Sequence, residues 1–301
     1  MYELDVDNLV IFTIDTNLNR TITPVSRMFR EILKILDGKT EYIFRKDVDK
    51  FELRHPPRRI IQVYDTHYFP HPWLVRLYEK YKDSQIYYIS FDYLSSPYSS
   101  VAKIFRQRGI VIGNSEKIVG FKPYKYKWVN LNVLNVQEFT WKDERLYDII
   151  YWGRFRRYRI EYFRKYFREI YISTTSRNIK KFEPYCSNCI FIPPIDWRNP
   201  ILKYFKTSIY IEDPKTHKIY NYLGSRWYEA ISCGVLTVFD ESCRRTIELS
   251  GYEIPDELII SDRSAVRTDI HNYKSLIKSW HSQSLTEKQE VLGRLKEIFN
   301  Q

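Results

Sequence analysis

Short apolar runs alternate with amphipathic stretches along most of the chain. In the first half, apolar runs that predict strands occupy residues 9–14, 42–44, 59–64, 86–91 and 110–112. Helical spacing of apolar positions falls between them, at residues 24–36 and 73–81 and in the stretch that ends near residue 108. In the second half, predicted strands occupy residues 147–151, 169–173, 208–211 and 235–240, and predicted helices close the chain at residues 264–280 and 286–299. Alternation at this spacing predicts parallel, doubly wound sheets.

The alternation pauses at residues 136–145, which are polar and lack a clear period, and then restarts. We therefore expect an N-terminal domain of residues 1–140 and a C-terminal domain of residues 141–301, with the last helix packing back on the first domain. Two successive α/β halves place a ligand in the cleft between them, at the carboxyl ends of both sets of strands. The expected fold is thus two Rossmann-like, doubly wound domains facing a central cleft.

Residues 221–240 form the most informative stretch, a predicted helix that leads into a buried strand. Arg226 and Glu229 share one face near the start of this helix, and Gly234 lies just past its end, where helix caps favour glycine. A helix N-terminus carries positive partial charge and suits a phosphate, so Arg226 could clamp a diphosphate and Glu229 could accept ribose hydroxyl protons. The alternative is a surface Arg–Glu pair next to a packed tryptophan.

A second motif, YWGRFRRYR at residues 151–159, directly follows a predicted strand. Gly153 permits close backbone approach to a ligand. Arg154, Arg156 and Arg159 can offer forked donors to a diphosphate. The motif is neither a dinucleotide-binding fingerprint nor a P-loop, and a basic, solvated turn is the alternative.

Asp92 stands at the end of the predicted strand 86–91, so we expect it to face the ligand cleft. A single carboxylate there can deprotonate an acceptor hydroxyl as that hydroxyl attacks a sugar carbon, which inverts the anomeric centre. Capping of the following turn is the alternative role. Asp65, after the preceding strand, is the competing candidate for the base.

The net charge of +11 and the 17% aromatic content favour a polyanionic partner. Basic and aromatic residues interleave at positions 124–128 and 155–168, a pattern that suits phosphates and stacked bases, although it also occurs on solvated helix faces. The sequence shows no run of 18 apolar residues and no signal-peptide pattern, so we expect a cytosolic protein without a membrane partner. Among the four cysteines only Cys186 and Cys189 have CxxC spacing, and nothing completes a zinc site, so we expect reduced thiols and no metal ligands.

Three segments, in order along the chain, resemble the DNA β-glucosyltransferases of T-even bacteriophages, which have the GT-B fold. YYISFD at residues 87–92 is similar to the family's strand before its catalytic aspartate. DIIYWGRFR at residues 148–156 is similar to the family's Asp-x-Ile-Tyr-Gly-Gly-Ser-Phe-Arg donor loop. Arg226, Glu229, Asp240 and Glu241 are similar to its Arg-x-x-Glu helix and the strand after it, which ends in Asp-Glu.

The resemblance implies an inverting transfer of glucose from UDP-glucose to 5-hydroxymethylcytosine in duplex DNA, with Asp92 as general base. The donor residues that it implies are Arg156, Arg159 and Arg226 on the diphosphate, Glu229 on the ribose and the backbone of Ile195 on the uracil. This chain has Trp152 and Arg154 where the family has glycine and serine, and it is shorter than the T-even enzyme, so 5-hydroxymethyluracil or another sugar stays open.

A hydroxymethyl group on a stacked base cannot enter a deep cleft, so the expected enzyme flips the nucleotide out and recovers that cost through phosphate contacts. We expect a monomer, with Mg²⁺ or Mn²⁺ as candidate stimulating ions. Two other functions fit the same residues: a GT-B transferase that acts on a glycan, lipid or protein, and a non-catalytic α/β protein that binds nucleic acid. DNA-dependent hydrolysis of the donor and affinity for UDP separate the three.

Overall fold

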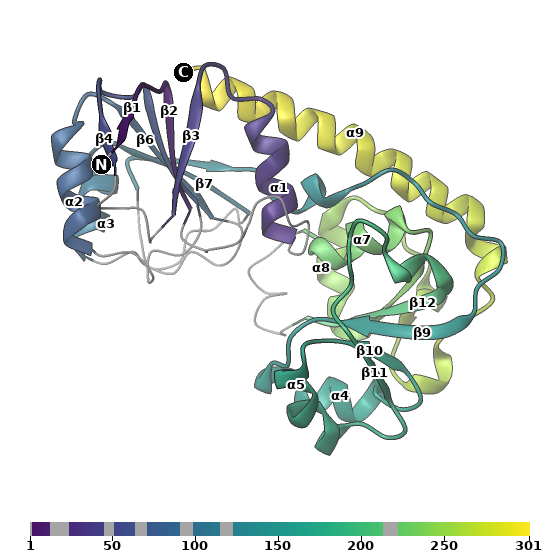
Figure 1. Cartoon of the computed structure of the whole chain (residues 1–301). Helices are drawn as coiled ribbons and strands as arrows, with labels where there is room; N and C mark the ends of the chain where they lie inside the picture. Colours follow the sequence, from purple (N-terminus) through teal and green to yellow (C-terminus); the bar gives the residue numbers. More distant parts are fainter. Residues whose placement is uncertain are drawn as a thin grey trace. The chain divides into compact units, whose positions relative to one another are not determined.

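The computed structural model describes residues 2–12, 24–44, 51–63, 71–90, 99–114, 123–212 and 222–301 (Figure 1). The chain divides into two compact units, each with its own sheet. The first unit includes Val25–Leu131 and Glu290–Gln301, and the second includes Asn132–Gln289.

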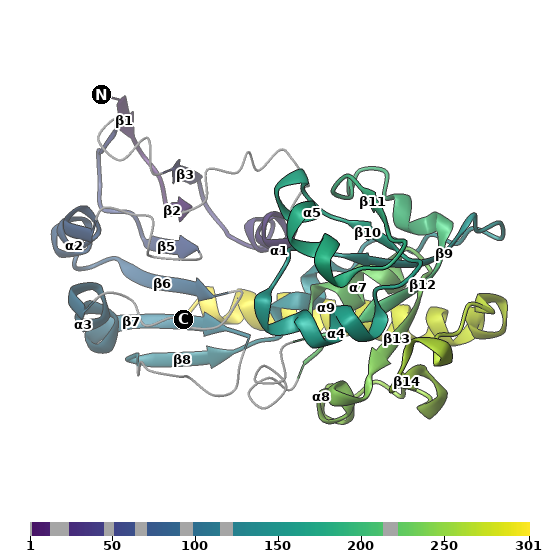
Figure 2. The ribbon, with the colours of Figure 1, turned by 90° about the horizontal axis from the view of Figure 1, so that it is seen from below.

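The first unit contains a six-stranded parallel sheet in the order β3-β2-β5-β6-β7-β8. Its strands are β2 (Asn8–Phe12), β3 (Thr40–Phe44), β5 (Arg59–Val63), β6 (Gln85–Ser90), β7 (Gly109–Gly113) and β8 (Lys125–Trp128). A separate parallel pair joins β1 (Tyr2–Leu4) to β4 (Phe51–Leu53). Helices α2 (His71–Lys80) and α3 (Ser99–Arg108) lie on one face of the sheet and α1 (Pro24–Leu33) on the other (Figures 1 and 2).

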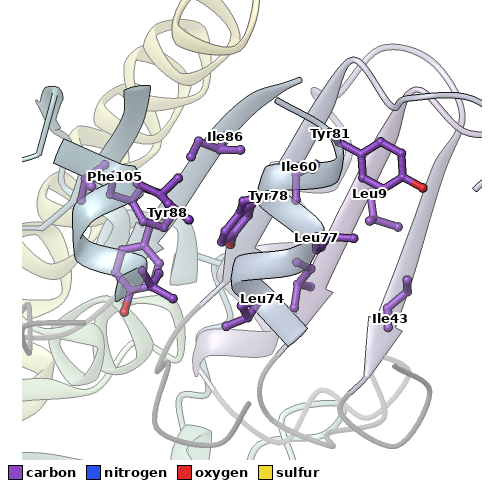
Figure 3. Close-up of a cluster of buried hydrophobic side chains, with 14 of the residues drawn as sticks. Leu9, Ile43, Ile60, Leu74, Leu77, Tyr78, Tyr81, Ile86, Tyr88 and Phe105 are labelled. Carbon is purple, nitrogen blue, oxygen red and sulfur yellow. The ribbon is translucent and has the colours of Figure 1, made fainter. Parts of the chain in front are cut away.

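The core of the first unit explains why its strands are continuous apolar runs. Helices cover both faces, so β5 and β7 are buried along their whole length. Leu74, Leu77 and Tyr78 of α2 pack against the strands in a cluster that includes Ile60 (Figure 3). The Tyr78 hydroxyl donates to Gln62 Oε1 at 2.5 Å.

The interleaved basic and aromatic residues at 124–128 form the edge strand β8. Lys125 is exposed, whereas Tyr126 packs against the buried cluster and Trp128 Nε1 donates to the carbonyl of Asn114 at 3.1 Å. Lysines on an edge strand discourage pairing with other chains, so this part of the pattern has a structural explanation.

The second unit contains a six-stranded parallel sheet in the order β11-β10-β9-β12-β13-β14. Its strands are β9 (Tyr147–Trp152), β10 (Tyr171–Ser173), β11 (Ile190–Ile192), β12 (Phe205–Tyr210), β13 (Leu236–Asp240) and β14 (Ile259–Ile260). The helices are α4 (Ile160–Tyr166), α5 (Ser176–Phe182), α7 (Ser225–Ser232), α8 (Arg244–Ser250) and α9 (Lys274–Phe299). Numbered along the chain, the strand order is 3-2-1-4-5-6, the order of dinucleotide-binding Rossmann domains.

The prediction of two closing helices was wrong. Residues 274–299 form one continuous helix, α9, and short 3₁₀ turns occupy part of the stretch before it. The mainly polar residues at 281–286 continue α9, and their hydroxyls bond main-chain carbonyls one turn back: Ser284 Oγ donates to that of Trp280 at 2.8 Å and Thr286 Oγ1 to that of Ser282 at 3.3 Å. Serine and threonine satisfy their hydroxyls in this way inside helices.

A buried arginine fastens the end of α9 within the first unit. Arg59 is fully buried, and its Nε donates to the carbonyl of Phe299 at 2.8 Å, while Nη1 donates to Asn8 Oδ1 at 2.9 Å and to Asp37 Oδ1 at 2.6 Å. The ring of Tyr87 lies 5.0 Å from that of Phe299. A cation is favourable at a helix C-terminus, where carbonyls lack intrahelical partners.

The two parallel sheets confirm the predicted doubly wound fold class. The pattern missed short elements, including β11, which lies in a stretch that we expected to be loop-rich, and α8. Strand β11 has only three residues and is half-exposed, so it lacks the apolar signature of a central strand. Among the described residues, no helix is both long and apolar enough to cross a membrane.

Candidate functional site

The strand order of the second unit locates a candidate site at the carboxyl ends of β9 and β12. From β9 the chain proceeds to β10 and β11 on one side, and then returns to β12 on the other side. Open α/β sheets bind ligands at such a switch point, outside the carboxyl ends of the strands. The predicted motif 151–159 begins with the last two residues of β9 and continues into the turn after it, and α7 follows β12. The topology therefore brings both predicted motifs to one sheet edge.

Gly153 begins the turn after β9 and has a φ of +143°, which side chains other than hydrogen rarely tolerate. Its N–H donates to the carbonyl of Ser173 at 3.2 Å, and its own carbonyl accepts from Thr174 Oγ1 at 2.8 Å. A Cβ at this position would stand 3.5 Å from Arg226 Nη1. The glycine therefore allows close approach of the backbone to the arginine, whereas the predicted approach of a ligand to this backbone stays a prediction.

Arg226 and Arg159 converge on the hydroxyl of Tyr151. Arg226 Nη1 donates to this hydroxyl at 2.9 Å and Arg159 Nη1 donates to it at 3.1 Å. The guanidinium carbon of Arg226 also lies 5.2 Å from the centre of the Tyr151 ring and 5.7 Å from that of Tyr210. These contacts hold two cations side by side at the start of α7, an arrangement that suits a diphosphate.

Glu212, two positions after the end of β12, pairs with both arginines, and the sequence analysis did not identify it. Its Oε1 accepts from Arg226 Nη2 and its Oε2 from Arg159 Nη2. Arg226 Nη2 also donates to the carbonyl of Ile211 at 2.7 Å. An acidic residue immediately after a predicted strand was the available signal, since Asp92 was selected on that basis.

The electrostatics of the cluster favour charged arginines. Burial is the largest single effect and lowers the pKa of each guanidinium, but the Glu212 carboxylate and the neighbouring tyrosine hydroxyls together outweigh it. The pKa values of Arg226 and Arg159 are therefore raised above their ordinary values. Arg159 Nε is buried and has no hydrogen-bond partner within the described residues. The cluster therefore holds two permanent cations and one carboxylate, and the N–H of Arg159 Nε remains available for a further hydrogen bond.

Glu229 faces the protein interior, so the alternative of a surface Arg–Glu pair was wrong. Its side chain is only 2% exposed, and Glu229 Oε2 accepts a 2.8 Å hydrogen bond from Trp152 Nε1. Trp152 stands where the resembled family has a loop glycine. The indole therefore orients the carboxylate from the end of β9, one helical turn from Arg226.

The remaining predicted donor residues differ in exposure. Arg154 and Arg156 are exposed, and their side chains make no hydrogen bond or ion pair with another described residue, so these side chains are available to a ligand. Ile195 is buried in a cluster with Trp152 and Ala230, so the predicted contact of its backbone with the uracil stays a prediction.

Asp92 and its competitor Asp65 both lie outside the described residues, so their roles stay predictions. Strand β6 ends at Ser90, two positions before Asp92, and β5 ends at Val63, two positions before Asp65. The two strands are neighbours in the first sheet with parallel register.

Asp240 is the last residue of β13, and its carboxylate already bonds neighbouring protein groups. It is 2% exposed, and it accepts hydrogen bonds from Tyr166 at 2.5 Å, Lys165 at 2.9 Å and the Ser242 N–H at 2.9 Å. Although burial opposes ionisation, these donors lower the pKa of Asp240. The carboxylate therefore ties β13 to α4.

The four cysteines are free thiols. Burial and the Cys186 thiol have opposing effects on Cys189; the hydrogen bond from Cys186 is the larger and lowers the pKa of Cys189 to about 7. Within the residues that the structure describes, His, Cys, Asp and Glu form no group of three or more that could hold a metal ion.

Comparison with known proteins gives structural neighbours only. No family model matches the chain, and no curated protein matches it. One solved structure, an alpha-glucosyltransferase in complex with UDP and a 13-mer DNA containing an HMU base, has a TM-score of 0.55 and 13% identity, with 96% of this chain and 94% of the neighbour covered. Another, an alpha-glucosyltransferase in complex with UDP-glucose and DNA containing an abasic site, has a TM-score of 0.50 and 12% identity, with 99% and 95% covered.

The likeness covers nearly the whole of each chain and extends through both units. It shows that the chain has the two-domain GT-B fold of these glucosyltransferases, as the sequence predicted. Both neighbours are alpha-glucosyltransferases, whereas the sequence motifs resemble the β type.

Proposed function

We propose that this protein transfers a sugar from a UDP-sugar, by default UDP-glucose, to DNA. The observation that carries the proposal is the pair of arginines, Arg159 and Arg226, held side by side at the switch point of the second sheet. The fold likeness supports the choice of substrates, since one neighbour was solved with UDP-glucose and both were solved with DNA.

In this proposal the second unit binds the donor. Arg226 and Arg159 hold the diphosphate at the N-terminus of α7, and Gly153 lets the ligand approach the backbone after β9. Arg154 and Arg156 reach the diphosphate from the exposed side. Because these arginines supply positive charge, we assign Mg²⁺ or Mn²⁺ at most a stimulating role.

The nucleoside end of the donor would extend toward Glu229 and Ile195. Glu229 is oriented by Trp152 Nε1 and would accept hydrogen bonds from the ribose hydroxyls. The main chain at Ile195, whose side chain is buried, would bond the uracil edge.

For the acceptor, we propose the hydroxymethyl group of 5-hydroxymethylcytosine or 5-hydroxymethyluracil in duplex DNA, flipped out of the stack. The acceptor side belongs to the first unit, and the protein acts as a monomer in the cytosol. The net charge of +11 supports a polyanionic acceptor. Binding to duplex DNA should therefore weaken steeply as salt rises, because neutralised phosphates release counterions. A flat salt response would contradict a DNA acceptor.

Asp92 is the proposed general base of an inverting displacement. We expect Asp92→Asn to fold and to bind donor and DNA, but to transfer sugar at least about a hundredfold more slowly. The alpha names of the two neighbours favour the opposite stereochemistry, retention of the donor's α configuration. The coupling constant of the anomeric proton in the product, measured by NMR, distinguishes inversion from retention. An α-linked product, or full activity in Asp92→Asn with none in Asp65→Asn, would overturn the proposed mechanism.

The decisive experiment incubates hydroxymethylated duplex DNA with a panel of UDP-sugars and analyses the nucleosides by mass spectrometry. We expect a glycosylated hydroxymethylpyrimidine with at least one donor. Donor hydrolysis that does not respond to DNA would instead indicate a glycan, lipid or protein acceptor. An absence of UDP binding together with DNA binding would indicate a non-catalytic nucleic-acid-binding protein.

A further inference from the structure

The two arginines of the proposed donor site already have an anionic partner. Glu212 places one carboxylate oxygen on each guanidinium, so a single side chain bridges Arg159 and Arg226. All three side chains are largely buried, with exposed fractions of 11% for Arg159, 13% for Arg226 and 19% for Glu212. The Glu212 carboxylate therefore uses the two guanidinium groups that would otherwise bind the diphosphate of a donor.

The position of Arg226 explains why an anion is needed there. Arg226 lies in the first turn of α7, which contains no acidic residue, so its charge meets the positive end of the helix dipole. The charge of Arg226 also disfavours the charge of Arg159. Two buried cations at a helix N-terminus are unfavourable without a counter-ion, and Glu212 supplies it.

The cluster has donors beyond those that Glu212 uses. Arg159 Nε is buried without a hydrogen-bond partner among the described residues. Arg226 Nη1 lies close to the space that the missing side chain of Gly153 leaves open. One carboxylate therefore satisfies the cluster incompletely, whereas a diphosphate offers more acceptor oxygens and a larger negative charge.

We propose that Glu212 is a built-in placeholder: its carboxylate occupies the arginine pair in the free protein, and the diphosphate of the donor must displace it. The inference deepens the proposed function and rests on the donor site described above. A side-chain carboxylate can leave by rotating about its own bonds, whereas the arginines stay in place through Tyr151 and the carbonyl of Ile211.

This role has a thermodynamic consequence. If the arginines are available only in the fraction of molecules whose Glu212 has moved away, the apparent affinity for a diphosphate is reduced by that fraction. Removing the carboxylate charge should therefore tighten binding. A residue that merely positioned the arginines would have the opposite effect, because its loss would loosen them.

The test measures binding of pyrophosphate and of UDP by isothermal titration calorimetry to the wild type, Glu212→Gln and Glu161→Gln. Glu161 is the matched control, an exposed glutamate on α4 that pairs with Arg164. We expect Glu212→Gln to bind both probes about tenfold more tightly than the wild type, with Glu161→Gln unchanged. Equal or weaker binding by Glu212→Gln would overturn the placeholder.

Glu212→Asp covers the case in which the glutamine variant fails to fold. It keeps the charge but is one methylene too short to bridge both arginines, so we expect a smaller gain in affinity for both probes. No gain in this variant would also overturn the inference. Failure of the proposed function gives a different pattern: UDP would bind no tighter than pyrophosphate to any of the proteins, while Glu212→Gln would still bind pyrophosphate more tightly than the wild type.

Discussion

A largely buried arginine lies at each end of helix α7, Arg226 within its first turn and Arg145, from the segment before β9, next to its C-terminal end, and the two differ in the partners that they bond. At the C-terminal end, Arg145 donates to the main-chain carbonyls of Cys233 at 3.2 Å and Gly234 at 3.0 Å, and also to those of Phe205 and Lys142 at 2.9 Å. At the N-terminal end, Arg226 bonds a tyrosine hydroxyl, one carbonyl and the carboxylate of Glu212.

This difference separates a structural arginine from a binding one. The carbonyls around Arg145 belong to the folded backbone and cannot leave it without local unfolding, and a cation is favourable at that end of the helix dipole. Burial lowers the pKa of Arg145 to about 10, so its contacts must compensate for desolvation. Arg226 stands at the unfavourable end, next to an anion that can rotate away. Burial of an arginine therefore does not identify a site, whereas an exchangeable partner does.

The largest expected effect tests the structural end. Arg145→Ala should lower the free energy of unfolding by about 3 kcal/mol, because several buried carbonyls lose a charged donor. Urea denaturation measures this change. Arg244→Ala is the control: Arg244 is half-exposed and pairs with Asp256 on the surface, so its loss should cost less than about 1 kcal/mol. If Arg145→Ala and Arg244→Ala lost the same free energy of unfolding, Arg145 would not be the structural arginine described above.

Arg226→Ala should show the reverse pattern. We expect UDP affinity to fall by about 1.5–3 kcal/mol, the value of a hydrogen bond to a charged group, with a smaller loss of stability than in Arg145→Ala. Glu212 keeps Arg159 as a partner in this variant, which limits the structural cost. Calorimetry with UDP measures the affinity, and Arg244→Ala again serves as the control. Unchanged UDP binding would mean that the donor lies elsewhere.

Glu229→Ala sharpens the comparison within the binding end of the helix. UDP affinity should fall by about 1 kcal/mol through loss of the ribose contact, whereas pyrophosphate affinity should stay the same. Titration of both ligands into one protein sample makes the comparison internal. Equal losses for UDP and pyrophosphate would show that Glu229 acts on the arginines and not on the ribose.

The smallest effect concerns Asp240, a carboxylate near the same sheet edge with fixed partners. Its folded pKa is lowered below the unfolded value, so it stabilises the fold above the unfolded pKa of about 3.9, and this contribution is lost as pH falls through the folded pKa. Asp240→Asn should therefore lose less stability than the wild type on acidification below about pH 4. The exposed Asp148→Asn serves as the control in denaturation curves at several pH values. An unchanged acid dependence in Asp240→Asn would contradict the assignment.

Local patterns in the sequence determined the elements that frame the site. Gly234 follows α7 with a φ of +63°, and the N–H groups of Gly234 and Val235 bond the carbonyls of Ile231 and Ala230, which completes the glycine cap that the sequence predicted. Gly153, which the sequence marked as a point of close backbone approach, has a positive φ of +143° that a glycine adopts readily. These features depend on neighbouring residues alone, and the chain order of strands and helices was enough to indicate two doubly wound sheets.

Tertiary structure alone decided which charged groups meet. Tyr151, Arg159, Glu212 and Arg226 come together because β9 and β12 are neighbours at the switch point, and local sequence patterns do not encode the pairing of strands so far apart in the chain. The fold also brings Trp152 to Glu229. Their buried hydrogen bond stands where the sequence spacing also allowed a surface ion pair between Arg226 and Glu229. Sequence identified Arg159 from its basic turn after a strand and Arg226 from its place near the start of a predicted helix, and both are local signals. Their shared carboxylate was assigned only by the fold, because its partners lie 53 and 14 residues away along the chain.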